Sequence, residues 1–192
     1  MGQCWSQMDW NGVIYMKITK FKDVPRFTRD GTYQVDYDFK HLVNALDMLE
    51  KNHGLQLNPK FQRGHVWTRE QQIAWLEFFL RGGRSGRILY FNKPDWNVSV
   101  PEGAYNDFVC VDGLQRITAI RAFMNGEIPA FGSYINEFTD QMSIVRDSIK
   151  MNVNDLKSEK EVLQWYVDMN AGGTPHTDAE IERVKKMIAE LE

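Results

Sequence analysis

The segment Phe108–Arg116 carries the residue types and the spacing best suited to chemistry. An apolar run ends at Asp112-Gly113, and the apolar residues that follow recur at helical spacing, which predicts a strand, a turn and a helix. The first turn of a helix has unpaired backbone N–H groups and the positive end of the helix dipole, so it attracts phosphate. Gly113 lets the backbone approach a ligand closely, and Arg116 can hold two phosphate oxygens. Asp112 can orient a metal-bound water or a sugar hydroxyl.

A purely structural interpretation of this turn stays open. Asp112 would then cap the helix, and Arg116 would pair with a carboxylate on the surface. The residue types alone do not choose between the two interpretations.

A second polar stretch, Pro59–Trp67, combines an amide, a guanidinium, an imidazole and an indole without a clear amphipathic period. Arg63 can bind a phosphate. Trp67 can stack on a base, but an aromatic residue just before an N-cap is more typical of packing. His65 can act as a base near neutral pH, although a satisfied structural histidine is the commoner case.

Residues 57–87 hold six basic and two acidic side chains, an excess of positive charge on a chain whose net charge is −3. Basic residues interleaved with glycine suit the phosphates of a nucleotide or of a DNA backbone. We therefore assign a DNA-binding role to Lys60, Arg81, Arg84 and Arg87. For Arg84 and Arg87, pairing with carboxylates elsewhere is an equal alternative.

The composition predicts an ordered protein of the cytoplasm. Hydrophobic residues make up 43% of the 192 residues and aromatic residues 12%, enough for a sizeable core in one domain spanning 1–192. The acidic balance gives no global attraction to nucleic acid, so DNA contact requires a local patch. Two cysteines without metal-ligand spacing indicate a reducing compartment. Residues 1–11 lack the pattern of a signal peptide, and no stretch is long enough for a membrane span.

Hydrophobic periodicity indicates interleaved strands and helices, hence an α/β or α+β class with a small mixed sheet. Capping boxes are expected at Thr68, Ser158 and Thr177. Residues 131–151 are ambiguous between a strand or hairpin and irregular structure. The expected strands cover 13–19, 32–37, 88–91 and 108–111, and the expected helices begin near 39, 68, 114, 158 and 177.

Several common catalytic patterns are absent from the sequence. It contains no Walker-type phosphate loop, no Gly-x-Gly-x-x-Gly after a strand, no zinc-spaced Cys or His set and no serine nucleophile elbow.

Three motifs resemble signatures of the N-terminal domain of GmrSD-type restriction enzymes, in the same order and over about 40–190. Residues 61–67, Phe-Gln-Arg-Gly-His-Val-Trp, resemble its "QR-x-x-V-W" signature. Residues 112–116, Asp-Gly-Leu-Gln-Arg, resemble "DGQQR", and residues 168–175 resemble its "N-x-G-G-T-P-L" turn. At Leu114 the family motif has glutamine, so this side chain either packs inward or removes a polar contact.

The resemblance implies an α+β fold of the ParB/sulfiredoxin-like kind, a small mixed sheet with flanking helices, that binds nucleotides. It implies catalytic roles for Asp112, Gln115 and Arg116, with Asp112 holding Mg²⁺ or orienting water. It also implies a nucleotide-binding set. That set comprises Gln62, Arg63, His65, Gly113, Thr118, Asn170, Gly172 and Gly173.

The leading hypothesis is a nucleoside-triphosphate-hydrolysing domain linked to DNA restriction, defence or phage DNA processing, in a prokaryotic or phage-infected cell. The alternatives are a DNA-binding adaptor without turnover, a ParB-like metal-dependent nuclease and a phosphotransferase. The expected partners are a nucleotide, DNA and a separate nuclease subunit, with no membrane contact. The base of the nucleotide, the DNA target and the oligomeric state are not specified by the sequence.

Overall fold

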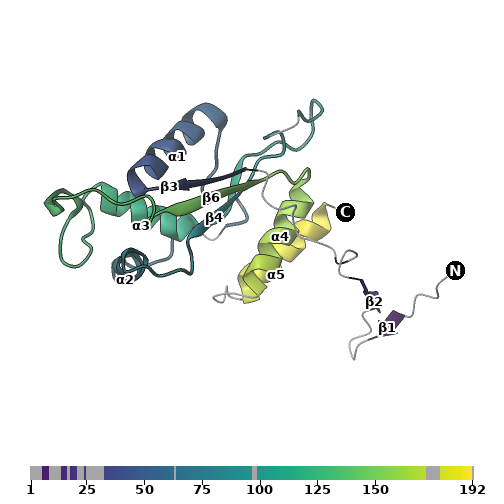
Figure 1. The fold of residues 1–192 in the computed structure, drawn as a ribbon. Coiled ribbons are helices and arrows are strands. Elements are labelled where there is room, and N and C mark those ends of the chain that lie inside the picture. The colour runs from purple at the N-terminus through teal and green to yellow at the C-terminus, as the bar shows by residue number, and fades with distance from the viewer. Residues whose placement is uncertain are drawn as a thin grey trace.

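The computed structural model describes residues 6–8, 14–16, 18–20, 24, 33–62, 64–96, 99–171 and 178–191. Their elements run from a short strand pair near the N-terminus to two helices near the C-terminus (Figure 1). In chain order they are β1 (Ser6–Met8), β2 (Ile14–Met16), β3 (Tyr33–Tyr37), α1 (Phe39–His53), α2 (Arg69–Leu80), β4 (Ile88–Asn92), β5 (Val109–Asp112), α3 (Leu114–Met124), the 3-10 helix η2 (Ile135–Glu137), β6 (Ile149–Asn154), α4 (Glu159–Ala171) and α5 (Asp178–Glu190).

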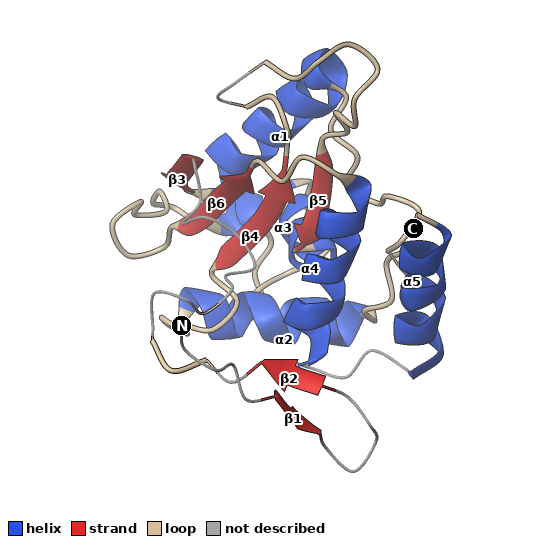
Figure 2. Ribbon diagram, turned by 90° about the vertical axis from the view of Figure 1, so that its right-hand side faces the viewer, coloured by secondary structure: helices blue, strands red, loops and turns tan. Residues whose placement is uncertain are grey.

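The main sheet has four strands in the order β3-β6-β4-β5 (Figure 2). Strand β6 pairs antiparallel with β3 and parallel with β4, while β4 pairs antiparallel with β5. Strands β1 and β2 form a separate antiparallel pair. The class is therefore α+β with a mixed sheet and flanking helices, as the sequence predicted, and it is compatible with the fold that the resemblance implies.

Helices cover both faces of the sheet, and strands β4 and β5 contribute apolar side chains to both. Leu89, Phe91 and Cys110 belong to the larger core with α1, α2 and α3. Val109 and Val111 point the other way and pack against α4 and α5. This alternation explains why the run before Asp112 is continuously apolar, since a strand buried on both faces needs no polar side. Figures 1 and 2 show α4 and α5 on the face opposite α1 and α3.

Local capping fixes where the helices begin. The Asp38 carboxylate accepts from the His41 backbone N–H at 2.9 Å at the start of α1. Thr68 and Gln71 form both bonds of the expected capping box at α2. Ser158 and Glu161 do the same at α4, so that prediction is also confirmed. The third box, at Thr177, lies outside the described residues.

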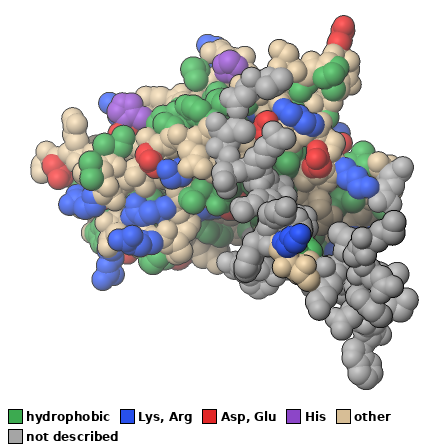
Figure 3. Space-filling view, turned by 45° about the vertical axis from the view of Figure 1, so that its right-hand side comes forward, with side chains coloured by type: hydrophobic (Ala, Val, Ile, Leu, Met, Phe, Trp, Pro, Cys, Tyr) green, Lys and Arg blue, Asp and Glu red, His purple; other side chains and the backbone are tan. Residues whose placement is uncertain are grey.

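Residues 131–151 are mostly turns that lead into β6, which begins only at Ile149. The described part of the expected strand 13–19 includes β2. None of the described helices is long and apolar enough to cross a lipid bilayer. Lys and Arg side chains gather at the left-hand end of the face drawn in Figure 3.

Candidate functional site

A cavity of about 530 Å³ opens where β5 turns into α3. Its wall combines three regions that are distant in the sequence: the pair Gln62 and Trp67, residues 84–88, and the turn 111–116. Tyr166 and Met169 of α4 close another side. Gln62, Asp112, Gly113, Gln115 and Arg116 therefore line this one space, which we call the first cavity.

The turn at Gly113 directs the start of α3 into the first cavity. Gly113 has φ +137, and a Cβ there would lie 2.7 Å from the Leu89 Cδ2 atom, so only glycine fits without displacement. Gly113 is the N-cap of α3, and no side chain among the described residues makes an N-cap hydrogen bond there. The Asp112 cap considered from the sequence is therefore wrong. The Leu114 N–H is directed to the buried Cys110 sulfur, and the next first-turn N–H groups of this 11-residue helix and the positive end of its dipole are left for a ligand.

Asp112 and Arg116 form an ion pair on the cavity wall through Oδ2 and Nη2. Arg116 is only 12% exposed, so it is not the surface residue of the structural interpretation. Its Nη1 also donates to the carbonyls of Gly86 at 2.9 Å and Ile88 at 2.7 Å. Arg116 thus ties the 86–88 loop to α3. Asp112 is 42% exposed, and its second carboxylate oxygen makes no hydrogen bond within the described part of the chain.

The two glutamines of the motifs are bound to the polypeptide itself. Gln115 Oε1 accepts from the backbone N–H groups of Val66 at 2.9 Å and Trp67 at 3.1 Å, and its Nε2 donates to the Gly64 carbonyl at 2.7 Å. Gln62 Nε2 donates to the Cys110 carbonyl at 2.9 Å and to that of Val111 at 3.2 Å. These amides hold the loop 62–67 against the end of β5.

Arg84 is the uncommitted cation of the first cavity. It is exposed, and its side chain makes no hydrogen bond or ion pair within the part of the chain that the structure describes. Nearby, the Trp75 Nε1 lies 3.4 Å, and the Arg116 Nη1 3.7 Å, from the position that a Cβ on Gly86 would occupy. An indole N–H and a guanidinium therefore flank the same glycine.

Aromatic rings form two further parts of the wall. The rings of Trp67 and Trp75 lie 6.1 Å apart between their centroids, both half-buried. On the α4 side, Tyr90 packs edge-on against Trp165, and Tyr166 packs edge-on against Phe61. Trp67 thus packs, as its position before the N-cap predicted, and also lines the cavity.

Residues 45–150, more than half of the chain, match the family described as the GmrSD restriction endonuclease, N-terminal domain. The chain belongs to this family. No curated protein and no solved structure matches the chain significantly. The match covers Gln62, Arg84 and the whole turn 112–116, and it ends before α4. The GmrSD family places the chain in a restriction-related context.

Several residues that the sequence analysis assigned to the nucleotide lie elsewhere in this GmrSD domain. His65 Nε2 is hydrogen-bonded to Gln72 Nε2 at 2.6 Å and is not part of the first cavity's wall. Thr118 donates to the Leu114 carbonyl at 2.9 Å and lines another cavity, beside Glu50. Three further positions, Arg63, Gly172 and Gly173, lie outside the described residues, as does the side chain of Asn170.

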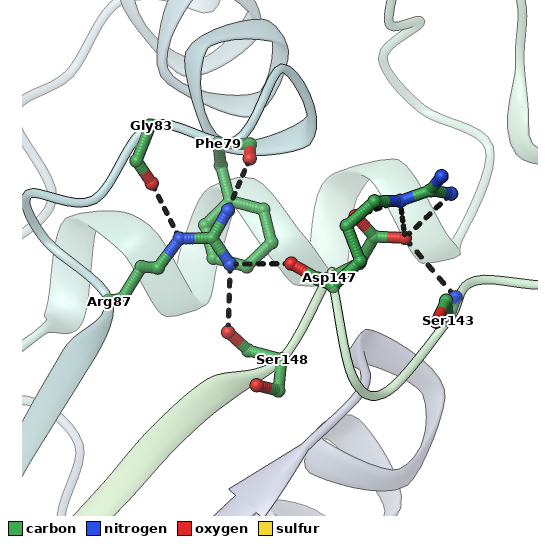
Figure 4. A network of polar contacts seen from close by, with 7 residues as sticks. Phe79, Gly83, Arg87, Ser143, Asp147 and Ser148 are labelled. Atoms are coloured by element: carbon green, nitrogen blue, oxygen red, sulfur yellow. Dashed lines mark hydrogen bonds and ion pairs between the residues drawn. The ribbon is translucent and has the colours of Figure 1, made fainter.

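The proposed DNA-binding residues also separate into two kinds. Lys60 and Arg81 are exposed and lie off the first cavity. Arg87, by contrast, is hydrogen-bonded to the backbone of the domain itself, as Figure 4 shows. Its guanidinium lies 3.9 Å from the centroid of the Phe79 ring and donates to four backbone carbonyls. The acceptors are Phe79 at 2.7 Å, Ser148 at 3.0 Å, Arg146 at 3.3 Å and Gly83.

This network corrects the role expected of Arg87. A guanidinium has five N–H donors, and carbonyls already take four of these, so Arg87 has little left to offer a phosphate. Burial lowers the pKa of Arg87 below its ordinary value; the carboxylate of Asp147 acts against this shift, and the neighbouring charge of Arg84 acts with it. Arg87 instead joins the end of α2 to the turn before β6.

The described residues do not form a metal site of their own. No three His, Cys, Asp or Glu side chains among them lie close enough to share an ion. Asp112, the residue expected to hold Mg²⁺, has one oxygen bound to Arg116.

Proposed function

We propose that this GmrSD N-terminal domain binds a nucleoside triphosphate in the first cavity and hydrolyses its terminal phosphoryl group. The observation that carries the proposal is the meeting of an uncapped helix N-terminus with the uncommitted Arg84 in one cavity of about 530 Å³. This volume lies within the range of roughly 300–1,000 Å³ typical of small-molecule sites.

The phosphate end of the nucleotide would lie at the first turn of α3. Backbone N–H groups and the helix dipole favour an anion there. Arg84 adds a free guanidinium, which can bind phosphate oxygens in parallel. The Trp75 indole N–H is a further donor beside Gly86. Because Arg116 is neutralised by Asp112, Arg84 supplies most of the local positive charge.

The base end would lie on an aromatic wall. Trp67 and Trp75 present two indole rings, and stacking on such rings tolerates any base because every base has a π-face. The loop that carries Trp67 is held by Gln115, so the turn that would bind phosphate also positions the ring that would bind the base. We therefore expect weak discrimination between bases.

Hydrolysis would depend on Asp112. One carboxylate oxygen is fixed by Arg116, and the other is available to orient a water molecule toward the terminal phosphoryl group. Phosphoryl transfer requires mainly positioning and electrostatic stabilisation of the charged transition state. Arg84 would supply the stabilisation, and Asp112 the positioning.

The test is a binding titration with ATP, GTP, CTP and UTP, each with Mg²⁺ and with EDTA, followed by phosphate release. Arg84→Ala should weaken binding by about 10- to 100-fold, the value of a charge-assisted hydrogen bond, and should not alter stability because the side chain has no partner among the described residues. Arg81→Ala, exposed and off the cavity, is the matched control. Asp112→Asn should retain binding and lose phosphate release. If no nucleotide binds at millimolar concentration, the proposal fails.

A further inference from the structure

A second cavity, of about 480 Å³, lies beside the first and shares Arg84, Arg87 and Ile88 with it. Its other walls come from distant parts of the chain, the turn 145–148 and the start of β6. The network of Arg87 joins these parts, because Arg87 binds the carbonyls of Arg146 and Ser148. The second cavity is therefore a built feature of the fold.

The second cavity is cationic, and no aromatic side chain is among the described residues that line it. Arg84, Arg87, Arg146 and Lys150 line it against one carboxylate, Asp36. The Arg146 side chain is 73% exposed, and its Nε lies 3.3 Å from the Oδ1 of the buried Asp147. Lys150 pairs with Asp36 at 3.3 Å, and both side chains reach solvent. Exposed pairs of this kind contribute only about 0–1 kcal/mol, so a phosphate can replace the carboxylate at little cost.

We infer that the second cavity binds the phosphate backbone of double-stranded nucleic acid, next to the nucleotide proposed for the first cavity. Three cations suit successive phosphates of a backbone: Arg84 on one segment, and Arg146 and Lys150 on another, which reach solvent beside the carboxylates that they contact. Proteins that bind single strands combine such cations with aromatic stacking platforms. The second cavity has no such platform, which favours a duplex, whose bases are already stacked and paired.

Arg84 forms part of both cavities, so the two ligands share one guanidinium. Part of this inference therefore rests on the proposed nucleotide site. Arg146 and Lys150, however, belong to the second cavity and not to the first. Substitutions at these two residues separate the binding of a duplex from the binding of a nucleotide.

The experiment measures fluorescence anisotropy of a labelled 20-base-pair DNA duplex against the full chain at several KCl concentrations. The double variant Arg146→Ala/Lys150→Ala should weaken duplex binding on the order of tenfold and reduce the slope of log K against log salt by about 1.8, about 0.9 for each lost phosphate contact. The loss should be the same for unrelated sequences, because phosphate contacts carry no sequence information. Lys51→Ala/Lys186→Ala removes the same charge from exposed helix positions and is the control.

Further arms identify the ligand and isolate the nucleotide site. A single strand of the same sequence should bind more weakly than the duplex, and an RNA duplex shows whether DNA is preferred. Mononucleotide binding should be unchanged in Arg146→Ala/Lys150→Ala but lowered in Arg84→Ala. If both double variants affect duplex binding equally, or if the single strand binds more tightly, the inference is overturned. Failure of every mononucleotide to bind would overturn the proposed function alone.

Discussion

Gln115 offers the sharpest test of how this domain is built. Its amide makes three hydrogen bonds to the backbone of Gly64, Val66 and Trp67, and so connects the first turn of α3 to a loop about 50 residues earlier. Gln115→Met keeps the length and shape of the side chain and removes all three bonds. We expect this variant to lose stability, because the loop loses its attachment to α3.

The magnitude follows from the exposure of the groups involved. A neutral hydrogen bond contributes about 0.5–1.5 kcal/mol net. Val66 is exposed and its N–H can bind water instead, whereas Gln115 and Trp67 are half-buried. We therefore expect a loss of about 2 kcal/mol, which corresponds to a fall in Tm of about 4–8 °C for a domain of this size.

Thermal and urea denaturation followed by circular dichroism measure this loss. Gln164→Met is the control, because Gln164 is exposed on α4 and makes a single bond to Asp168 within the helix. Its cost should stay below about 0.5 kcal/mol. A Gln115→Met protein with unchanged Tm but no phosphate release would refute this reasoning. Gln115 would then act in catalysis, as the resemblance implied.

Two further predictions concern the same turn. Gly113→Ala should cost about 2–3 kcal/mol in urea denaturation, since its Cβ meets the buried Leu89 in addition to a strained φ. Gly132→Ala, at φ +79 with nothing within 4 Å of its Cβ, should show the backbone strain alone and a smaller loss of stability. Equal losses of stability in the two variants would exclude a clash between the Cβ at residue 113 and Leu89. Complete burial and then the Asp112 charge raise the pKa of the Cys110 thiol well above its ordinary value. In a Cys4→Ser background this thiol should react with DTNB at pH 8 only as fast as the protein unfolds, and rapid reaction in the folded state would contradict its burial.

The sequence predicted those parts of the fold that local chemistry controls. The capping residues Thr68 and Ser158 mark α2 and α4, and the apolar run before Asp112 is the buried strand β5. Hydrophobic periodicity did not distinguish strand β6 from the residues before it, because two of its buried positions, Asn152 and Asn154, are polar. They are buried in spite of this, and the Asn154 Nδ2 donates to the Asn152 Oδ1 at 3.0 Å. Such compensation between side chains cannot be read from hydrophobic periodicity.

The site was predicted in its location more than in its chemistry. The motif residues Gln62, Asp112 and Arg116 do line one cavity. Gln62 and Arg116, however, donate to backbone carbonyls, and Asp112 pairs with Arg116. Arg84 and Arg87 looked equivalent in the sequence. The fold distinguishes them, because four carbonyls accept from Arg87 and none in the described part of the chain accepts from Arg84. Arg146 was missed altogether, since it joins Arg84 only through the pairing of β6 with β4.

The departure from the family motif at Leu114 is explained by the roles of the backbone and the side chains at the start of α3. Its side chain is 9% exposed and packs into the core, so it takes the inward alternative. A side chain at the first position of α3 does not need to reach an anion, because the backbone N–H groups of the turn face it whatever the residue type. The polar residues that follow, Gln115 and Arg116, hold the turn in place by bonds to distant carbonyls and amides. Leucine at this position therefore removes no donor that the proposed phosphate site uses, and hydrolysis would depend on Asp112 and Arg84 instead.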